Sequence, residues 1–294
     1  MKIAEHHAIF ADSQKAIAEL SRRGLLMTSC VCVCGNDMWL KETACGDGQI
    51  FRCNAKRCRK KRSIRHGSFF SKSRLDLKQQ MLLIHLFSKR YPEWLVLEDY
   101  DFAQHTVVDW MRFCREICVG VIETMTVGCI RGPDIIVEID ESVIVRRKYE
   151  RGRLLSTQWM FGGVERTEGG HGRCFVEFVE RRSEDVLLEI IRRRIHPESR
   201  IMSDGWRAYR NLQEVGFRHD VVVHERNFVS PDDEEVHTQS VESLWSNLKR
   251  FLRTKGTNRS PHNWEYVCEF VYRRLNQNWF ESLLEHIKLQ YPLS

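Results

Sequence analysis

The chain lacks any hydrophobic run long enough to cross a membrane. No stretch of about 18 uncharged apolar residues occurs along its 294 residues. The first 23 residues carry Glu5, Asp12 and Glu19, so they do not contain the apolar segment of a secretory signal peptide. With 42% hydrophobic and 29% charged residues, the composition is that of a soluble globular protein. We expect an intracellular location and no membrane partner.

Acidic residues are missing from residues 52–65, where basic residues stand among cysteines. The eight basic residues there are Arg52, Lys56, Arg57, Arg59, Lys60, Lys61, Arg62 and Arg65. Residues 1–130 hold 20 basic against 14 acidic residues, whereas the remainder holds 26 of each. Because a basic surface attracts phosphates of any sequence, we expect nucleic-acid contacts in the first part, with Arg59 and Lys61 as candidates. A solvated basic face would have the same composition.

A disulfide framework is disfavoured because eleven cysteines is an odd number in a chain expected to be intracellular. Six of them cluster within 29 residues: Cys30, Cys32, Cys34, Cys45, Cys53 and Cys58. Such a cluster is typical of a zinc ribbon, in which four thiolates and Zn²⁺ stabilise a small module. We predict a ribbon over residues 25–70, with ligands Cys34, Cys53, Cys58 and Cys30, and with Cys32 as the substitute for Cys30. A degraded, metal-free ribbon is the alternative.

Three carboxylates follow structured segments in the second half of the chain. Asp140 ends the apolar, β-branched run 135–140, Asp204 ends a short strand-like segment, and Glu242 lies within a helical pattern. Carboxylates held together repel one another, so a site that gathers them requires a divalent cation such as Mg²⁺ or Mn²⁺. Taken singly, Asp204 also fits an Asp-Gly turn, and Glu242 fits a solvated helix residue.

The three acids are separated by 63 and 37 residues, and each stands in a distinctive segment: EIDES at 138–142, SDGWRAY at 203–209 and HTQSVESLWSNLKR at 237–250. These segments resemble the DDE transposases of the Merlin superfamily and their bacterial ISXO-type insertion-sequence relatives. The resemblance extends over about residues 25–276. It implies that Asp140, Asp204 and Glu242 are catalytic and bind two Mg²⁺ ions, and that Lys249 contacts a DNA phosphate.

The alternation of patterns after residue 131 predicts strands at 135–140, 157–166, 173–180, 199–203 and 219–225. Helices are predicted at 183–195 and 206–215, and a further one carries Glu242. This β-β-β-α-β-α-β-α order is that of an RNase H-like fold, to which the resembling family belongs. We therefore expect an α/β (α+β) fold with an RNase H-like core of five mixed strands at residues 131–262.

Helical patterns flank this core. We expect an N-terminal helix within residues 1–24 and C-terminal helices at 263–294 that pack on the core. Helical stripes at 75–90 and 106–123, with a short helix at 94–100 between them, fit a helix-turn-helix module at residues 71–130. The resemblance supports that module, in which Arg112 and Arg115 are candidate DNA contacts.

The resemblance implies a DNA transposase that cleaves terminal inverted repeats and transfers the freed strands, as in cut-and-paste transposition. Its partner would be double-stranded DNA, and the pairing of two element ends predicts a homodimer on DNA. We expect a nuclear location in a eukaryotic host and a cytoplasmic one in a bacterial host. A domesticated, non-cutting DNA-binding protein and a structure-specific nuclease of the same fold are the alternatives.

Overall fold

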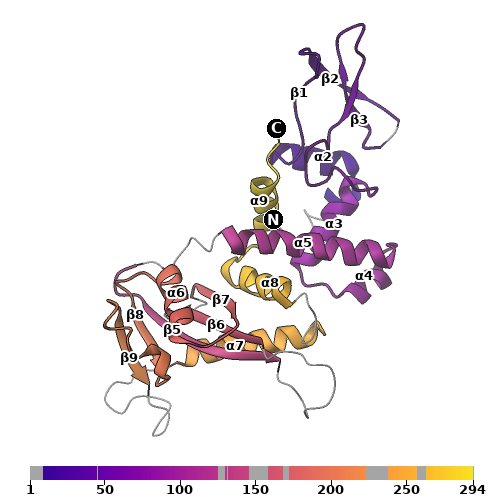
Figure 1. Ribbon diagram of the computed structural model, residues 1–294. Coiled ribbons are helices and arrows are strands. Elements are labelled where there is room, and N and C mark those ends of the chain that lie inside the picture. The colour runs from indigo at the N-terminus through magenta and orange to yellow at the C-terminus, as the bar shows by residue number, and fades with distance from the viewer. Residues whose placement is uncertain are drawn as a thin grey trace. The chain divides into compact units, whose positions relative to one another are not determined.

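The chain forms two compact units, Met1–Ile117 with Asn278–Ser294, and Cys118–Gln277 (Figure 1). The structure is a computed structural model that describes residues 9–44, 46–124, 130, 132–145, 158–167, 172–222, 238–256 and 263–293. Each unit has its own sheet. No helix within the described ranges is long and apolar enough to span a membrane.

The sheet of the first unit is a small antiparallel ribbon in the order β1-β2-β3-β4. Its strands are β1 (Cys30–Val31), β2 (Asp37–Glu42), β3 (Gln49–Cys53) and β4 (Lys61–Ser63). Successive side chains alternate between the two faces of a strand. Met38 and Phe51 are therefore buried on one face, while Trp39 and Arg52 are exposed on the other.

Helices make up the rest of the first unit: α2 (Ser13–Arg22), α3 (Leu77–Ser88), α4 (Glu93–Asp99), α5 (Gln104–Thr124) and α9 (Trp279–Gln290). Asp76 and Gln79 form a capping box that fixes the start of α3. The predicted helices at 75–90, 94–100 and 106–123 are confirmed by α3, α4 and α5, of which α5 runs on into the second unit. Their arrangement as a helix-turn-helix stays a prediction, as do the domain boundaries.

The second unit is built on a mixed five-stranded sheet in the order β7-β6-β5-β8-β9. Its strands are β5 (Ile136–Val145), β6 (Gln158–Glu165), β7 (Cys174–Val179), β8 (Arg200–Asp204) and β9 (Arg218–Val222). β5 pairs antiparallel with β6 and parallel with β8, so it occupies the centre. The five predicted strands and the mixed sheet are confirmed.

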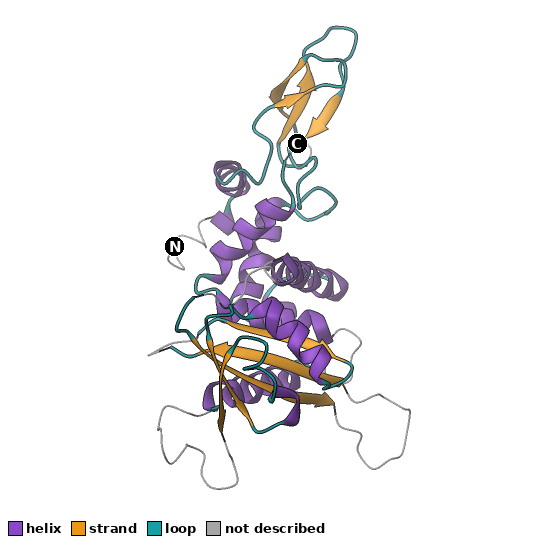
Figure 2. Ribbon diagram, turned by 60° about the vertical axis from the view of Figure 1, so that its left-hand side comes forward, coloured by secondary structure: helices purple, strands orange, loops and turns teal. Residues whose placement is uncertain are grey.

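Helices lie on both sides of this sheet (Figure 2). One side is covered by α6 (Glu184–Arg194) and the short 3-10 helix η2 (Arg207–Tyr209), which share a core with Val137 and Ile139 of β5. The other side is covered by α7 (Gln239–Thr254) and α8 (Asn263–Leu275). The alternation of side chains along β5 therefore directs Glu138 and Asp140 towards α7.

The predicted helix at 206–215 is wrong. Only η2 forms there, and turns continue to Gly216, whose φ of 95° favours glycine. Ala208, Tyr209 and Leu212 are nevertheless buried in the core beside α6. Packing of these three side chains, rather than helical periodicity, decides the path of the segment.

Candidate metal centres

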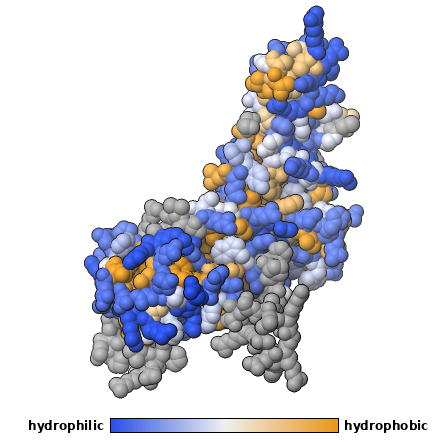
Figure 3. Space-filling view, viewed as in Figure 1, coloured by the Kyte–Doolittle hydropathy of each residue, from blue (hydrophilic) through white to orange (hydrophobic). Residues whose placement is uncertain are grey.

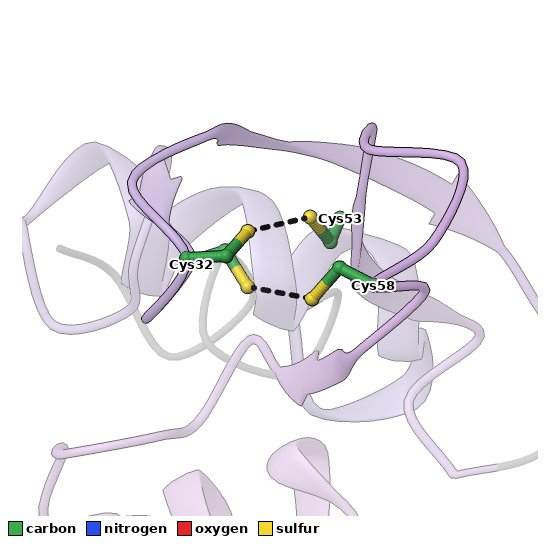
Figure 4. A group of neighbouring side chains, drawn as sticks. Cys32, Cys53 and Cys58 are labelled. Atoms are coloured by element: carbon green, nitrogen blue, oxygen red, sulfur yellow. Dashed lines mark hydrogen bonds between the residues drawn. The ribbon is translucent and has the colours of Figure 1, made fainter.

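Four cysteine thiols of the ribbon gather within bonding range of a single ion. The Sγ atoms of Cys32, Cys34, Cys53 and Cys58 all lie within 4.8 Å of one another. The Cys32–Cys58 and Cys34–Cys53 pairs are each separated by 3.5 Å (Figure 4). A tetrahedral Zn²⁺ with bonds of about 2.3 Å places its sulfur ligands about 3.8 Å apart. The cluster therefore fits Zn²⁺.

Two turns at the same end of the ribbon deliver these thiols. The amide of Gly35 donates to the carbonyl of Cys32 at 2.8 Å, which closes a tight turn around Cys32 and Cys34. The second turn follows β3, where the amide of Cys58 donates to the carbonyl of Ala55 at 3.0 Å. The backbone amide of Asn36 lowers the pKa of the Cys34 thiol to about 6, so this thiol is ready to bind a cation at neutral pH.

The choice of Cys30 as the fourth ligand is wrong, and its substitute Cys32 takes that place. Cys30 lies in β1 opposite Met38, and its Sγ is 3.5 Å from the Met38 Sδ. Arg62 also donates a hydrogen bond of 3.2 Å to the Cys30 Sγ. Strand pairing thus packs Cys30 against its neighbours, whereas Cys32 comes after the strand and turns towards Cys58.

A second candidate site lies where the parallel pairing between β5 and β8 stops. The ladder between β5 and β8 pairs Ile136 with Arg200 and Glu138 with Met202. The same offset aligns Asp140 with Asp204, two residues beyond the last recorded pair. The Asp204 carboxylate therefore comes from the end of β8, whereas the Asp140 carboxylate comes from the middle of β5, just beyond the last residues that pair with β8. The sequence expectation that Asp140 ends its strand is wrong, because pairing with β6 extends β5 to Val145.

The third acid, Glu242, is in the first turn of α7, on the side of the sheet that Asp140 faces. Two hydrogen bonds tie the acids to this helix. The Trp245 indole Nε1 donates to the Asp140 Oδ2 at 3.0 Å, and the Thr238 hydroxyl donates to the Glu242 Oε1 at 3.3 Å. The side chain of Glu242 is itself exposed.

The electrostatics of Asp140 place its carboxyl group within range of the charges of the other two acids. Burial raises the pKa of Asp140 to about 6, and repulsion from Asp204 and Glu242 adds to this rise. Within the described part of the chain, the four thiols are the one group of potential ligands found close enough together to hold an ion, and the three carboxylates do not form a second group of this kind.

Residues 133–274 match the family model of the ISXO2-like transposase domain. This segment belongs to that family. The transposase domain so defined contains all five strands of the mixed sheet, and it contains Asp140, Asp204 and Glu242. No curated protein matches the chain.

The transposase domain also contains a buried acid that sequence analysis did not assign to the site. Glu138 is fully buried, and its Oε2 accepts hydrogen bonds from the backbone amides of Ser240 at 2.6 Å and Val241 at 3.1 Å. Its Oε1 lies 2.8 Å from the Arg166 guanidinium. A carboxylate inside an apolar strand, two residues before Asp140 and so on the same face, was the available signal.

Glu138 thus joins the strand that carries Asp140 to the helix that carries Glu242. The first amides of a helix lack partners within it and carry partial positive charge, so a carboxylate there is stabilised. Thr238 precedes α7 but makes no capping hydrogen bond to its amides. Glu138 supplies that cap from the neighbouring sheet.

Gly162 gives Trp245 the space to reach Asp140. It lies opposite Asp140 in the β5–β6 ladder. A Cβ at this position would lie 2.6 Å from the Trp245 Cη2 and 2.9 Å from the Phe175 carbonyl oxygen. Only glycine therefore fits beneath the indole.

On the opposite face of β5, Glu141 approaches Tyr209. Burial and repulsion from Asp140 raise the pKa of Glu141 to about 7. Burial also raises the pKa of Tyr209 well above its ordinary value. The transposase domain thus holds a fourth carboxylate close to Asp140, but on the other side of the sheet.

The predicted DNA contacts differ in accessibility. Arg59 and Lys61 are exposed on the ribbon, and Lys249 is half-buried on α7. Arg112 is about half exposed and lies 3.3 Å from Glu116. Arg115 is buried, with 5% of its surface exposed, so burial removes it from the candidate phosphate contacts. His237, the first residue of the segment that carries Glu242, lies outside the described residues.

Proposed function

We propose that this protein is a DNA transposase that cleaves terminal inverted repeats and transfers the freed strands, with Asp140, Asp204 and Glu242 as its catalytic acids. One observation carries the proposal. Within a transposase domain, the Asp140 carboxylate in the central strand is close enough to Asp204 and Glu242 for their charges to raise its pKa. A divalent cation bound at these carboxylates would neutralise their mutual repulsion.

The sheet order supports an RNase H-like assignment for the core. A central strand that is antiparallel to β6 and parallel to β8 brings Asp140 beside the end of β8. A helix from the end of the domain then covers that face and adds the third acid. These features agree with the fold that the sequence resemblance implies.

The chemistry follows from the donor set. When bound, a pair of Mg²⁺ ions neutralises charge on the phosphodiester and lowers the pKa of an attacking water. Asp140, Asp204 and Glu242 would hold these ions through carboxylate oxygens. Trp245 fixes the orientation of Asp140, and Glu138 fixes the start of α7, so the acids are positioned before substrate arrives.

Recognition of DNA is assigned to the first unit. The thiol cluster would bind Zn²⁺ and hold the ribbon, on which Arg59 and Lys61 are exposed. Arg112 on α5 and Lys249 on α7 are further candidate phosphate contacts. Because transposition joins two DNA ends, we propose that a homodimer forms on DNA.

The test combines cleavage with binding. Asp140→Asn, Asp204→Asn and Glu242→Gln should each abolish Mg²⁺-dependent nicking of duplexes that carry the element ends, while binding of those duplexes persists. A variant with normal nicking would remove its residue from the site. Wild-type protein that binds but never cuts would indicate a domesticated DNA-binding protein, and cutting without strand transfer would indicate a nuclease.

A further inference from the structure

A row of exposed side chains crosses one face of the ribbon sheet. The strand register pairs Trp39 with Arg52, and Arg52 in turn with Lys61. Residues directly opposite in antiparallel strands project from the same face, about 5 Å apart. Lys41, two residues after Trp39, joins them on that face. We call these four residues, Lys41, Trp39, Arg52 and Lys61, the ribbon row.

The ribbon row belongs to the outer face of the ribbon. Met38, Phe51 and Cys53 point to the other face and are buried. Trp39 keeps 54% of its surface exposed, although it is the largest side chain of the sheet. Figure 3 shows hydrophobic residues interleaved with strongly hydrophilic ones on the ribbon. Stability of the ribbon core does not explain a tryptophan on this face.

The charge around Trp39 is positive. The Lys41 Nζ lies 5.5 Å from the centre of the indole ring. Within the described residues, Lys41, Arg52 and Lys61 form no ion pair. Of the two acids in β2, Asp37 lies on the same face opposite Val31 in β1, and Glu42 follows Lys41 on the other face. The ribbon row therefore combines an accessible aromatic ring with three cations that have no carboxylate partner among these residues.

We propose that the ribbon row binds single-stranded DNA, with an unpaired base stacked on Trp39 and the phosphates beside it held by Lys41, Arg52 and Lys61. Aromatic rings flanked by basic side chains bind single strands in this way, because every base has a π-face. Bases within a duplex are covered by their neighbours and offer no face to an indole. The inference rests on the proposed action on DNA, and it adds a preference for unpaired nucleotides next to the element ends.

The experiment measures binding of two labelled probes by the zinc-loaded full chain without added Mg²⁺. One probe is a single-stranded oligonucleotide, and the other is the blunt duplex of the same sequence. Trp39→Ala should weaken single-strand binding about tenfold, and duplex binding far less, whereas Trp39→Phe should keep most of the affinity. Arg52→Gln should weaken binding of both probes and reduce the salt slope by about one.

Trp94→Ala is the matched control. Trp94 is an exposed tryptophan on α4, with 65% of its surface accessible, but acidic residues surround it in the sequence: Glu93, Glu98 and Asp99. It should bind both probes as wild type does. Zinc stoichiometry of each variant verifies that the ribbon is intact. Unchanged single-strand binding by zinc-loaded Trp39→Ala overturns the proposal. If Trp39→Ala loses the same affinity for both probes, the ribbon row contacts duplex DNA instead. If Trp39→Ala binds DNA normally but no longer self-associates, the ribbon row is a protein interface instead.

Failure of this proposal is separable from failure of the proposed function. The binding measurement contains no cleavage step, so Mg²⁺-dependent nicking by the wild-type chain is an independent result. If the wild-type chain nicks DNA but Trp39 has no role in binding, only the proposal for the ribbon row is refuted. If the chain binds single strands through Trp39 but never nicks DNA, only the proposed transposase activity is refuted.

Discussion

The indole Nε1 of Trp245 donates a hydrogen bond of 3.0 Å to the Oδ2 of Asp140, which lies 105 residues earlier in the chain. This bond joins α7 to the middle of β5. A hydrogen bond to the ionised carboxylate favours that form and lowers the pKa of Asp140. Trp245 therefore both orients the carboxylate and helps to keep it charged.

Trp245→Phe should keep the buried packing of this side chain and remove only the donor. Because a hydrogen bond to a charged group contributes about 1.5–3 kcal/mol, we expect cleavage to fall about tenfold or more at neutral pH. The pKa of Asp140 should rise, so the acid limb of the pH–rate profile should move to higher pH. Single-turnover cleavage across pH measures both effects. Trp264→Phe, which loses an exposed indole contact to Glu123 at 3.3 Å, is the control and should leave the profile unchanged.

Gly162→Ala should destabilise the second unit. The new Cβ would lie 2.6 Å from Trp245 and 2.9 Å from the Phe175 carbonyl oxygen, so strand or helix must shift, at a cost of about 1–3 kcal/mol. Thermal unfolding should show a lower midpoint, and cleavage should fall with it. Gly205→Ala is the stability control, since its Cβ would meet no atom closer than 3.8 Å. Equal midpoints for the two variants would contradict the close approach of Trp245.

Glu138→Ala should lower the free energy of unfolding by about 3 kcal/mol, because it leaves Arg166 and two helix amides without their buried partner. Ser240→Ala removes only the hydroxyl that donates to Glu138 at 3.0 Å, and should cost about 1 kcal/mol. Urea titration measures both values. If Glu138→Ala costs no more than Ser240→Ala, Glu138 does not cap α7 as described.

The metal-free protein should lose stability as pH rises through about 6. The pKa of Asp140 is raised from 3.8 to about 6, so its contribution is fully present below about pH 4 and is lost above its folded pKa. A difference of about two pKa units corresponds to about 3 kcal/mol. Asp140→Asn should reduce this pH dependence without abolishing it, because burial also raises the pKa of Glu141 to about 7 and Glu141 loses stability over the same range. Mg²⁺ should restore stability at pH 8 in the wild type more than in Asp140→Asn, and urea titrations with and without Mg²⁺ test this.

Cys32→Ser and Cys30→Ser should differ sharply in zinc content. Cys32→Ser removes a member of the thiol cluster, so the ribbon should lose Zn²⁺ and with it most of the free energy that folds this small module. Cys30→Ser alters contacts with Val31, Met38 and Arg62 outside the thiol cluster and should retain one Zn²⁺ per chain. Metal analysis of the purified variants decides between them. Zinc loss in Cys30→Ser alone would restore Cys30 as the ligand.

Residues close in sequence determined much of this protein. The β-branched run before Asp140, the alternation of the later strands and the clustered cysteines depend on local periodicity and spacing, which a sequence displays directly. They predicted the mixed sheet, the helices before it and a ribbon with a thiol cluster. The catalytic assignment of Asp140, Asp204 and Glu242 rests on the family resemblance of the segments that carry them and stays a prediction for the cleavage assays.

Tertiary structure decided what depends on pairing between distant segments. Strand register turned Cys30 towards Met38 and left Cys32 for the thiol cluster, and burial of Tyr209 and Leu212 replaced an expected helix by turns. Contacts across more than a hundred residues gave Glu138 and Trp245 their places beside the acids. Periodicity says which face of an element is apolar, but it does not say which element covers that face. The partner of a buried carboxylate is therefore fixed only when the chain has folded.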